Sequence, residues 1–188
     1  MDAAQILSWS FGRAEAAALV GISTVQTSNY VRRYDLFPGR PRGKGHHVSF
    51  RLQELMKLRA VGLLIEAGLQ PEQAASALRL TRGPFSAMRH DGFGPKTEPL
   101  FTYPGTMFFT RNENGHWVEV DSADRPICIQ VRAWPIFDEL WPRIRAQILK
   151  EAEATPDKYP GDAVAGVKAF EDYIEKLRAE RWGEVRSA

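Results

Sequence analysis

The stretch FGRAEAAALVGISTVQTSNYVRRYDLF, residues 11–37, decides the fold of the N-terminal part of the chain. It predicts two short helices hinged at Gly21, because glycine tolerates the positive φ that a tight turn between helices needs. Ala16 and Val20 share one face of the first helix, where a second helix can pack closely. Ser23 stands where the N-cap of the second helix belongs. The pattern predicts a helix-turn-helix.

The second helix of this pair is expected to expose polar side chains. These are types that hydrogen-bond base edges and phosphates in the major groove of DNA. The plainer interpretation is a solvated face on an ordinary helical pair. The side chains in question are Thr24, Gln26, Ser28, Asn29, Arg32 and Arg33.

Composition places the 188-residue chain among ordinary globular proteins, with 44% apolar and 26% charged residues. No apolar run is long enough to span a membrane, and the N-terminus lacks the pattern of a secretory signal, so a cytoplasmic protein is expected. The lone Cys128 is interpreted as a small core residue. No spacing of histidines with cysteines or carboxylates predicts a metal site, and no cofactor is expected.

Charge is unevenly distributed along the chain. Residues 1–59 contain 9 Lys or Arg against 4 Asp or Glu, while the remainder contains 16 against 19. The basic excess therefore coincides with the helical pair. Such an asymmetry is typical of a chain whose one end binds a polyanion.

The segment GRPRGKGHHVSF, residues 39–50, predicts a basic hairpin, or wing, whose cations reach phosphates beside the groove. A merely solvated loop is the alternative. After it, apolar residues that recur every three or four positions predict a helix from Leu52 that ends near Gly68. A further short helix begins at Pro71.

Together these residues resemble the DNA-binding domain of the MerR family of transcription regulators. The resemblance is carried by GIS and YVRRYDLFP in the helical pair, HHVSF in the wing, and the helices LQELMKLRAVGLLIEAGL and QPEQAASAL, and it covers residues 12–80. It implies a winged helix-turn-helix that binds a roughly palindromic operator as a dimer. The recognition helices would lie in the major grooves, with the wings on the flanking backbone.

Position by position, the resemblance implies base contacts at Thr24, Gln26, Ser28 and Asn29. Phosphate contacts are expected from residues of the second helix and the wing, namely Ser23, Arg32, Arg33, Arg40, Arg42, Lys44 and His47. Phe50 takes the place of the aromatic residue that ends the wing. Two family features differ here: Ser28-Asn29 replaces the usual tyrosine-arginine pair, and Gly45-His46-His47 replaces the usual Gly-Tyr-Arg.

Residues 81–105 are rich in glycine and proline, so no long helix is expected to leave the DNA-binding domain. They predict a linker between a domain at 1–80 and a second domain at 106–188. The second domain is expected to hold three strands, at 106–111, 116–121 and 127–133, arranged as a meander, with a turn at 112–115. Two helices follow. The predicted fold class is mainly α with a small antiparallel sheet, or α+β.

The last helix carries an apolar stripe that admits two interpretations, a seam between two subunits or a face that covers the sheet of its own chain. Because the operator implied above needs a dimer, a homodimer is expected through residues 135–185. The stripe consists of Val167, Phe170, Ile174 and Leu177.

The sequence thus favours a sequence-specific regulator of transcription that binds double-stranded DNA. No catalytic residues are expected, because the sequence shows no nucleophile, base and orienting residue at the spacing of a catalytic motif. RNA polymerase and a small-molecule effector are further candidate partners. The aromatic residues in and just before the second domain predict either a pocket for a planar or cationic effector or ordinary core packing. They are Phe101, Tyr103, Phe108, Phe109, Trp117 and Trp134. Two alternatives stay open: an architectural DNA-binding protein of the excisionase type, and a protein-interaction module that has lost DNA binding.

Overall fold

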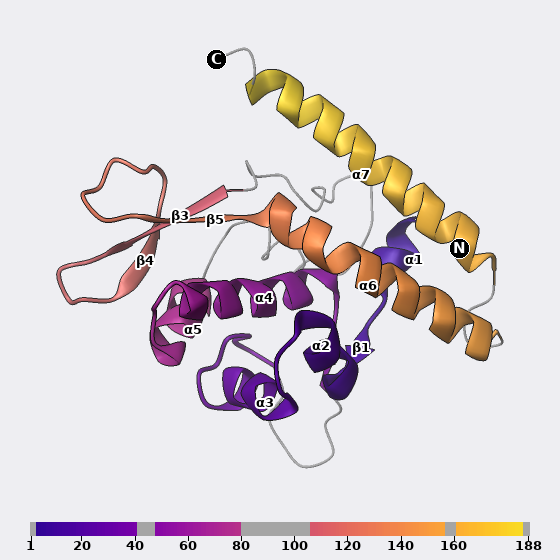
Figure 1. Cartoon of the computed structure of the whole chain (residues 1–188), viewed down its shortest axis with the longest axis horizontal. Helices are drawn as coiled ribbons and strands as arrows, with labels where there is room; N and C mark the ends of the chain where they lie inside the picture. Colours follow the sequence, from indigo (N-terminus) through magenta and orange to yellow (C-terminus); the bar gives the residue numbers. More distant parts are fainter. Residues whose placement is uncertain (1–2, 41–47, 80–105, 157–160, 186–188) are drawn as a thin grey trace. The chain divides into compact units, whose positions relative to one another are not determined.

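The structure of the chain, a computed structural model, describes residues 3–40, 48–79, 106–156 and 161–185. These residues form seven α-helices and two small antiparallel sheets (Figure 1). The predicted mainly α fold with a small antiparallel sheet is confirmed.

Two compact units are present among the described residues. One unit holds residues 3–9 and 141–185, and the other holds residues 10–140 as far as they are described. The division falls inside one long helix, between Leu140 and Trp141. The predicted linker at 81–105 lies outside the described residues, so the predicted domain boundaries stay predictions.

The helical pair of the larger unit is formed by α2 (Arg13–Val20) and α3 (Thr24–Arg32), joined at Gly21. Gly21 has φ 78° and ψ 30°, in the left-handed region, and its N–H donates to the carbonyl oxygen of Ala17 at 3.0 Å. No atom lies within 4 Å of the position that a Cβ would take. Backbone conformation, not space, therefore requires glycine here, and the predicted hinge is confirmed.

A two-stranded sheet ties the beginning of α2 to the residues that follow the predicted wing. Strand β1 (Phe11–Gly12) pairs antiparallel with β2 (Ser49–Phe50), with Phe11 opposite Phe50, and both rings are buried. The sequence predicted a strand ending at Phe50 as one arm of a hairpin. Among the described residues its partner is β1 instead, since the two phenylalanines share one core.

Helices α4 (Leu52–Glu66) and α5 (Pro71–Arg79) complete this part of the unit, as predicted. Lys57 on α4 is buried and donates from Nζ to the carbonyl oxygen of Arg79 at 3.2 Å, so it satisfies a backbone acceptor at the end of α5. The core between the two helices contains Leu55, Met56, Leu58, Leu64, Ala74, Ala75 and Leu78.

The second sheet consists of β3 (Thr106–Arg111), β4 (Trp117–Val120) and β5 (Ile129–Arg132), near their predicted positions. Its order is β4-β3-β5, so the predicted meander, in which β4 would be central, is wrong. The connection at 121–128 is long enough for β5 to reach the other edge of β3. There Val131 lies opposite Met107 and Ile129 opposite Phe109, which gives two apolar cross-strand pairs.

The turn between β3 and β4 is built by one asparagine side chain. Oδ1 of Asn112 accepts from the backbone N–H groups of Asn114 at 3.1 Å and His116 at 2.9 Å. Gly115 has φ 76°. The turn predicted at 112–115 is confirmed.

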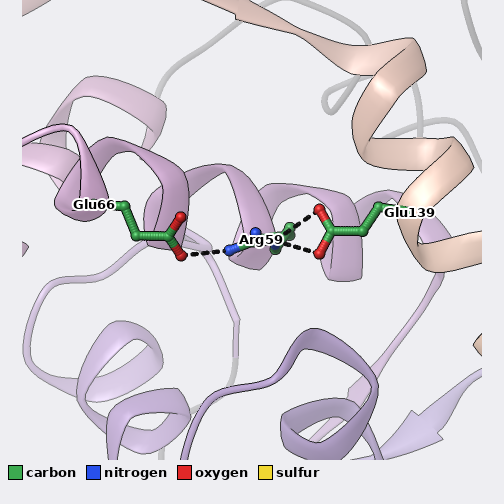
Figure 2. Close-up of polar contacts among 3 residues, drawn as sticks. All are labelled: Arg59, Glu66 and Glu139. Carbon is green, nitrogen blue, oxygen red and sulfur yellow. Dashed lines mark hydrogen bonds and ion pairs between the residues drawn. The ribbon is translucent and has the colours of Figure 1, made fainter.

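Helix α6 (Ala133–Ala154) follows β5 directly. In the larger unit its first turns are tied to α4, because Arg59 on α4 forms an ion pair with Glu139 (Figure 2). Arg59 also pairs with Glu66 of its own helix. One face of α6 is buried, and it consists of Phe137, Leu140, Trp141, Ile144 and Ile148.

In the smaller unit, α1 (Ala3–Ser8) packs against α7 (Ala163–Val185). Ile6 and Leu7 are buried in the unit that contains α7. Trp9 donates from Nε1 to Oε2 of Glu151 at 3.0 Å, which ties α1 to α6.

The stripe predicted as a dimer seam is buried inside one chain. Val167, Phe170 and Ile174 are 1%, 0% and 3% exposed, and the ring of Phe170 lies 4.7 Å from that of Trp141 on α6. These three side chains have no surface left for a second subunit, so their assignment to a seam is corrected. The stripe packs within its own chain, with α1 and α6 as its neighbours in the smaller unit. The side chain of Leu177 lies outside the described residues.

Candidate nucleic-acid interface

Helix α3 has one buried side that fixes its orientation on the rest of the unit. Thr27, Tyr30 and Val31 are buried, at 0%, 3% and 5% exposure. Arg13 on α2 donates from Nη1 to Oγ of Ser28 at 3.2 Å. Ser28 was predicted to contact bases, but it is half-buried and serves as a link between the two helices.

The first turn of α3 is closed by a capping box. Oγ of Ser23 accepts from the backbone N–H of Gln26 at 3.1 Å, and Oε1 of Gln26 accepts from the backbone N–H of Ser23 at 2.8 Å. Both side chains were predicted to contact DNA. The Ser23 hydroxyl and the side-chain carbonyl of Gln26 accept from backbone donors at the start of the helix. The amide NH2 of Gln26 takes no part in this capping box.

A row of exposed side chains lies on the side of α3 opposite its buried side. Val25, Asn29, Arg32 and Arg33 follow each other at spacings of four, three and one, which keeps them on one side of a helix. All four are exposed, as is Thr24 at the first helical position. Four of these five were predicted as DNA contacts, and three of them, Asn29, Arg32 and Arg33, lie together on this side. We call Val25, Asn29, Arg32 and Arg33 the α3 row.

Val25 is not among the side chains predicted to contact DNA, because those on α3 are all polar. It is 67% exposed, one of the large apolar side chains that stand out to solvent. The helical spacing indicates its exposure. Residue 25 comes four positions before Asn29 and five before Tyr30, so it points away from the side that Tyr30 buries.

Arg40, predicted to contact phosphates from the wing, is held at the base of that segment. Its guanidinium pairs with Glu54 on α4 and lies 4.8 Å from the ring centroid of Phe37 and 4.7 Å from that of Phe50. Only 16% of its side chain is exposed. An arginine that lies over two aromatic rings and pairs with a carboxylate serves a structural role. The assignment of Arg40 to phosphate binding is therefore corrected.

The other predicted wing contacts, Arg42, Lys44 and His47, lie outside the described residues. The structure does describe both ends of that segment. Arg40 is fixed on one side by Glu54 and the two rings, and β2 is fixed on the other by its pairing with β1. Both ends of the cationic segment are thus anchored to the unit that carries α3.

Tyr30 is the titratable group on the buried side of α3 whose proton affinity the fold changes. Burial raises the pKa of Tyr30, and the neighbouring Tyr34, whose ring centroid lies 6.2 Å away, raises it further. The phenol is therefore neutral over a wider pH range in the folded chain than in the unfolded chain.

The aromatic side chains for which the sequence allows either a pocket or a core on the second sheet mostly form core. Phe109, Trp117 and Trp134 are at most 8% exposed, and Phe101 and Tyr103 lie outside the described residues. Among the residues that the structure describes, no group of three or more His, Cys, Asp or Glu side chains is placed to hold a metal ion. Within the same ranges no helix has the length and apolar character needed to cross a membrane.

Comparison with known proteins adds no further identification: neither a scan against protein-family models nor a search of curated proteins gives a match for this chain.

Proposed function

We propose that this protein is a cytoplasmic, sequence-specific regulator of transcription that binds double-stranded DNA through a winged helix-turn-helix. Helix α3 enters the major groove, and the cationic segment after Phe37 lies on the flanking backbone. The observation that carries the proposal is the α3 row: one side of α3 is locked into the core by Thr27, Tyr30 and Val31, and the other side is presented to solvent.

The chemistry of the α3 row matches the surface of a major groove. An asparagine amide pairs with N6 and N7 of adenine, so Asn29 supplies base discrimination. The guanidinium groups of Arg32 and Arg33, one turn further along, supply phosphate contacts that depend on salt. Thr24 and the free amide nitrogen of Gln26 extend the donor set at the start of the helix.

The segment between Arg40 and β2 supplies the second contact of the proposal. Its sequence carries Arg42, Lys44 and His47. Because both of its ends are anchored to the unit that holds α3, phosphate contacts from this segment would add to those of the helix on one DNA molecule. Arg40 belongs to the anchor and not to the contact set.

Action as a homodimer is part of the proposal, because a palindromic operator presents two half-sites. Val167, Phe170 and Ile174 are excluded as its seam by their burial.

The protein-interaction module is the second candidate, and the capping box favours it to the extent that Ser23 and Gln26 already have partners within the chain. An excisionase-type architectural role would show DNA bending without any effect on a reporter promoter.

Selection of bound fragments from random double-stranded DNA tests the proposal. The wild-type chain should enrich a defined motif. Asn29→Ala should flatten the sequence preference, whereas Arg32→Ala should weaken binding to all sequences about equally. Failure to enrich any duplex, or equal loss of discrimination in both variants, contradicts the proposed function.

A further inference from the structure

The α3 row contains an apolar side chain where the proposed function calls for polar ones. Val25 is the second residue of α3 and is 67% exposed. Single exposed apolar side chains are common on protein surfaces, so exposure alone carries no function. The position of Val25 is what matters: it lies on the same side of the helix as Asn29, Arg32 and Arg33, in the first turn.

The first turn is the part of a recognition helix that reaches base edges in a helix-turn-helix. The major groove displays hydrogen-bonding groups on every base pair, and it displays one apolar group, the C5 methyl of thymine. A valine in a helix is held almost entirely in one χ1 rotamer, so its two methyl groups are already fixed before binding. Little side-chain entropy is lost when they meet another methyl group.

We infer that Val25 is a specificity-determining residue that reads a 5-methylpyrimidine, normally thymine, by methyl-to-methyl contact in the major groove. The inference rests on the proposed function and extends it from polar readout by Asn29 to apolar readout by its neighbour one turn earlier. The anchoring of α3 by the Ser23–Gln26 capping box and by Arg13 holds the Val25 backbone in place.

The test removes the methyl group from the DNA and the side chain from the protein. A duplex selected by the full-length chain is synthesised with each thymine replaced singly by deoxyuridine, which lacks only the C5 methyl. Binding is measured for the wild type and for Val25→Ala. The matched control is Val164→Ala, because Val164 is also the second residue of its helix and is 61% exposed.

At one position, deoxyuridine should weaken wild-type binding about fourfold, as expected for one buried methyl group. Val25→Ala should lose that penalty while Val164→Ala retains it. If every deoxyuridine penalty is the same in wild type and Val25→Ala, the inference is overturned and the proposed function still stands. If no duplex is enriched in the first place, the proposed function fails and the inference falls with it.

Discussion

The guanidinium of Arg59 on α4 donates from Nε to both carboxylate oxygens of Glu139 on α6, at 2.9 and 3.0 Å, and from Nη1 to Glu66 at 2.7 Å (Figure 2). Burial alone would lower the pKa of Arg59, but the hydrogen bonds and charges of the two glutamates outweigh it and raise the pKa. The Arg59 guanidinium therefore keeps its proton to a higher pH in the folded chain than in the unfolded chain. It joins α6 to α4 within the larger unit.

The two glutamates differ in exposure, which predicts unequal contributions. The side chain of Glu139 is 35% exposed and that of Glu66 is 62% exposed. Glu139→Gln should lower the free energy of unfolding by about 0.5–1 kcal/mol after allowance for solvent screening, and Glu66→Gln by less than about 0.3 kcal/mol. Urea unfolding of both variants measures this difference. Equal losses would mean that the Arg59–Glu139 contact contributes no more than a surface pair.

The capping box allows the structural role of Gln26 to be separated from its proposed role in DNA binding. Glutamate accepts the same backbone hydrogen bond, so Gln26→Glu should leave the free energy of unfolding within about 0.3 kcal/mol, whereas Gln26→Ala should lower it by about 0.5–1 kcal/mol. Gln26→Glu should nevertheless weaken DNA binding, because it adds a negative charge toward phosphates. Thermal unfolding and fluorescence anisotropy measure the two effects. Equal destabilisation by both substitutions would show that the box does not form in solution.

The burial of Phe170 predicts a large loss of stability within a single chain. Phe170→Ala removes a ring that is 0% exposed and packs on Trp141, which should cost about 3 kcal/mol. Lys168→Ala, at an exposed position of the same helix, is the control. The decrease should be the same when protein concentration is raised roughly a hundredfold, because no subunit interface is lost. A decrease that depends on protein concentration would show that Phe170 lies in an interface between two subunits.

The raised pKa of Tyr30 predicts a loss of stability at alkaline pH. A phenol whose pKa is higher in the folded chain contributes stability that is fully present below its unfolded value of about 10 and is lost as pH rises through the folded value. The free energy of unfolding of the wild type should fall relative to that of Tyr30→Phe above about pH 10. Denaturant unfolding from pH 7 upward at matched ionic strength measures it. Parallel curves would mean that Tyr30 titrates freely.

Features set by neighbouring residues could be predicted from the sequence. The Gly21 hinge, the Ser23 cap, the α5 start at Pro71 and the turn at Asn112 depend on a few adjacent residues, and all four are in place. Helix faces followed from the spacing of apolar residues, because a helix repeats every 3.6 residues.

Pairings between distant residues could not be predicted in the same way. Strands of two residues such as β1 and β2 give no alternation, and nothing local in Phe11 indicates Phe50 as its partner. The order of the second sheet depends on which edge of β3 the returning strand reaches. Arg40 in a glycine-rich segment reads as a free cation until Phe37, Phe50 and Glu54 are brought around it.

Salt-dependent binding to a DNA duplex tests the central claim most directly, since the claim is that Arg32 and Arg33 on the exposed side of α3 meet phosphates. Fluorescence anisotropy of a labelled duplex is measured over a range of salt concentrations for the wild type, the Arg32→Ala/Arg33→Ala double variant and Arg125→Ala. Arg125 is an exposed arginine in the connection between β4 and β5, and its loss removes one positive charge away from α3.

The wild type should bind tightly at low salt, with the logarithm of affinity falling linearly as the logarithm of salt rises. The slope should be shallower by roughly 1.8 in the double variant, for two lost phosphate contacts, and unchanged in Arg125→Ala. A chain that ignores double-stranded DNA at low salt, or a slope that is the same in all three proteins, would contradict the account.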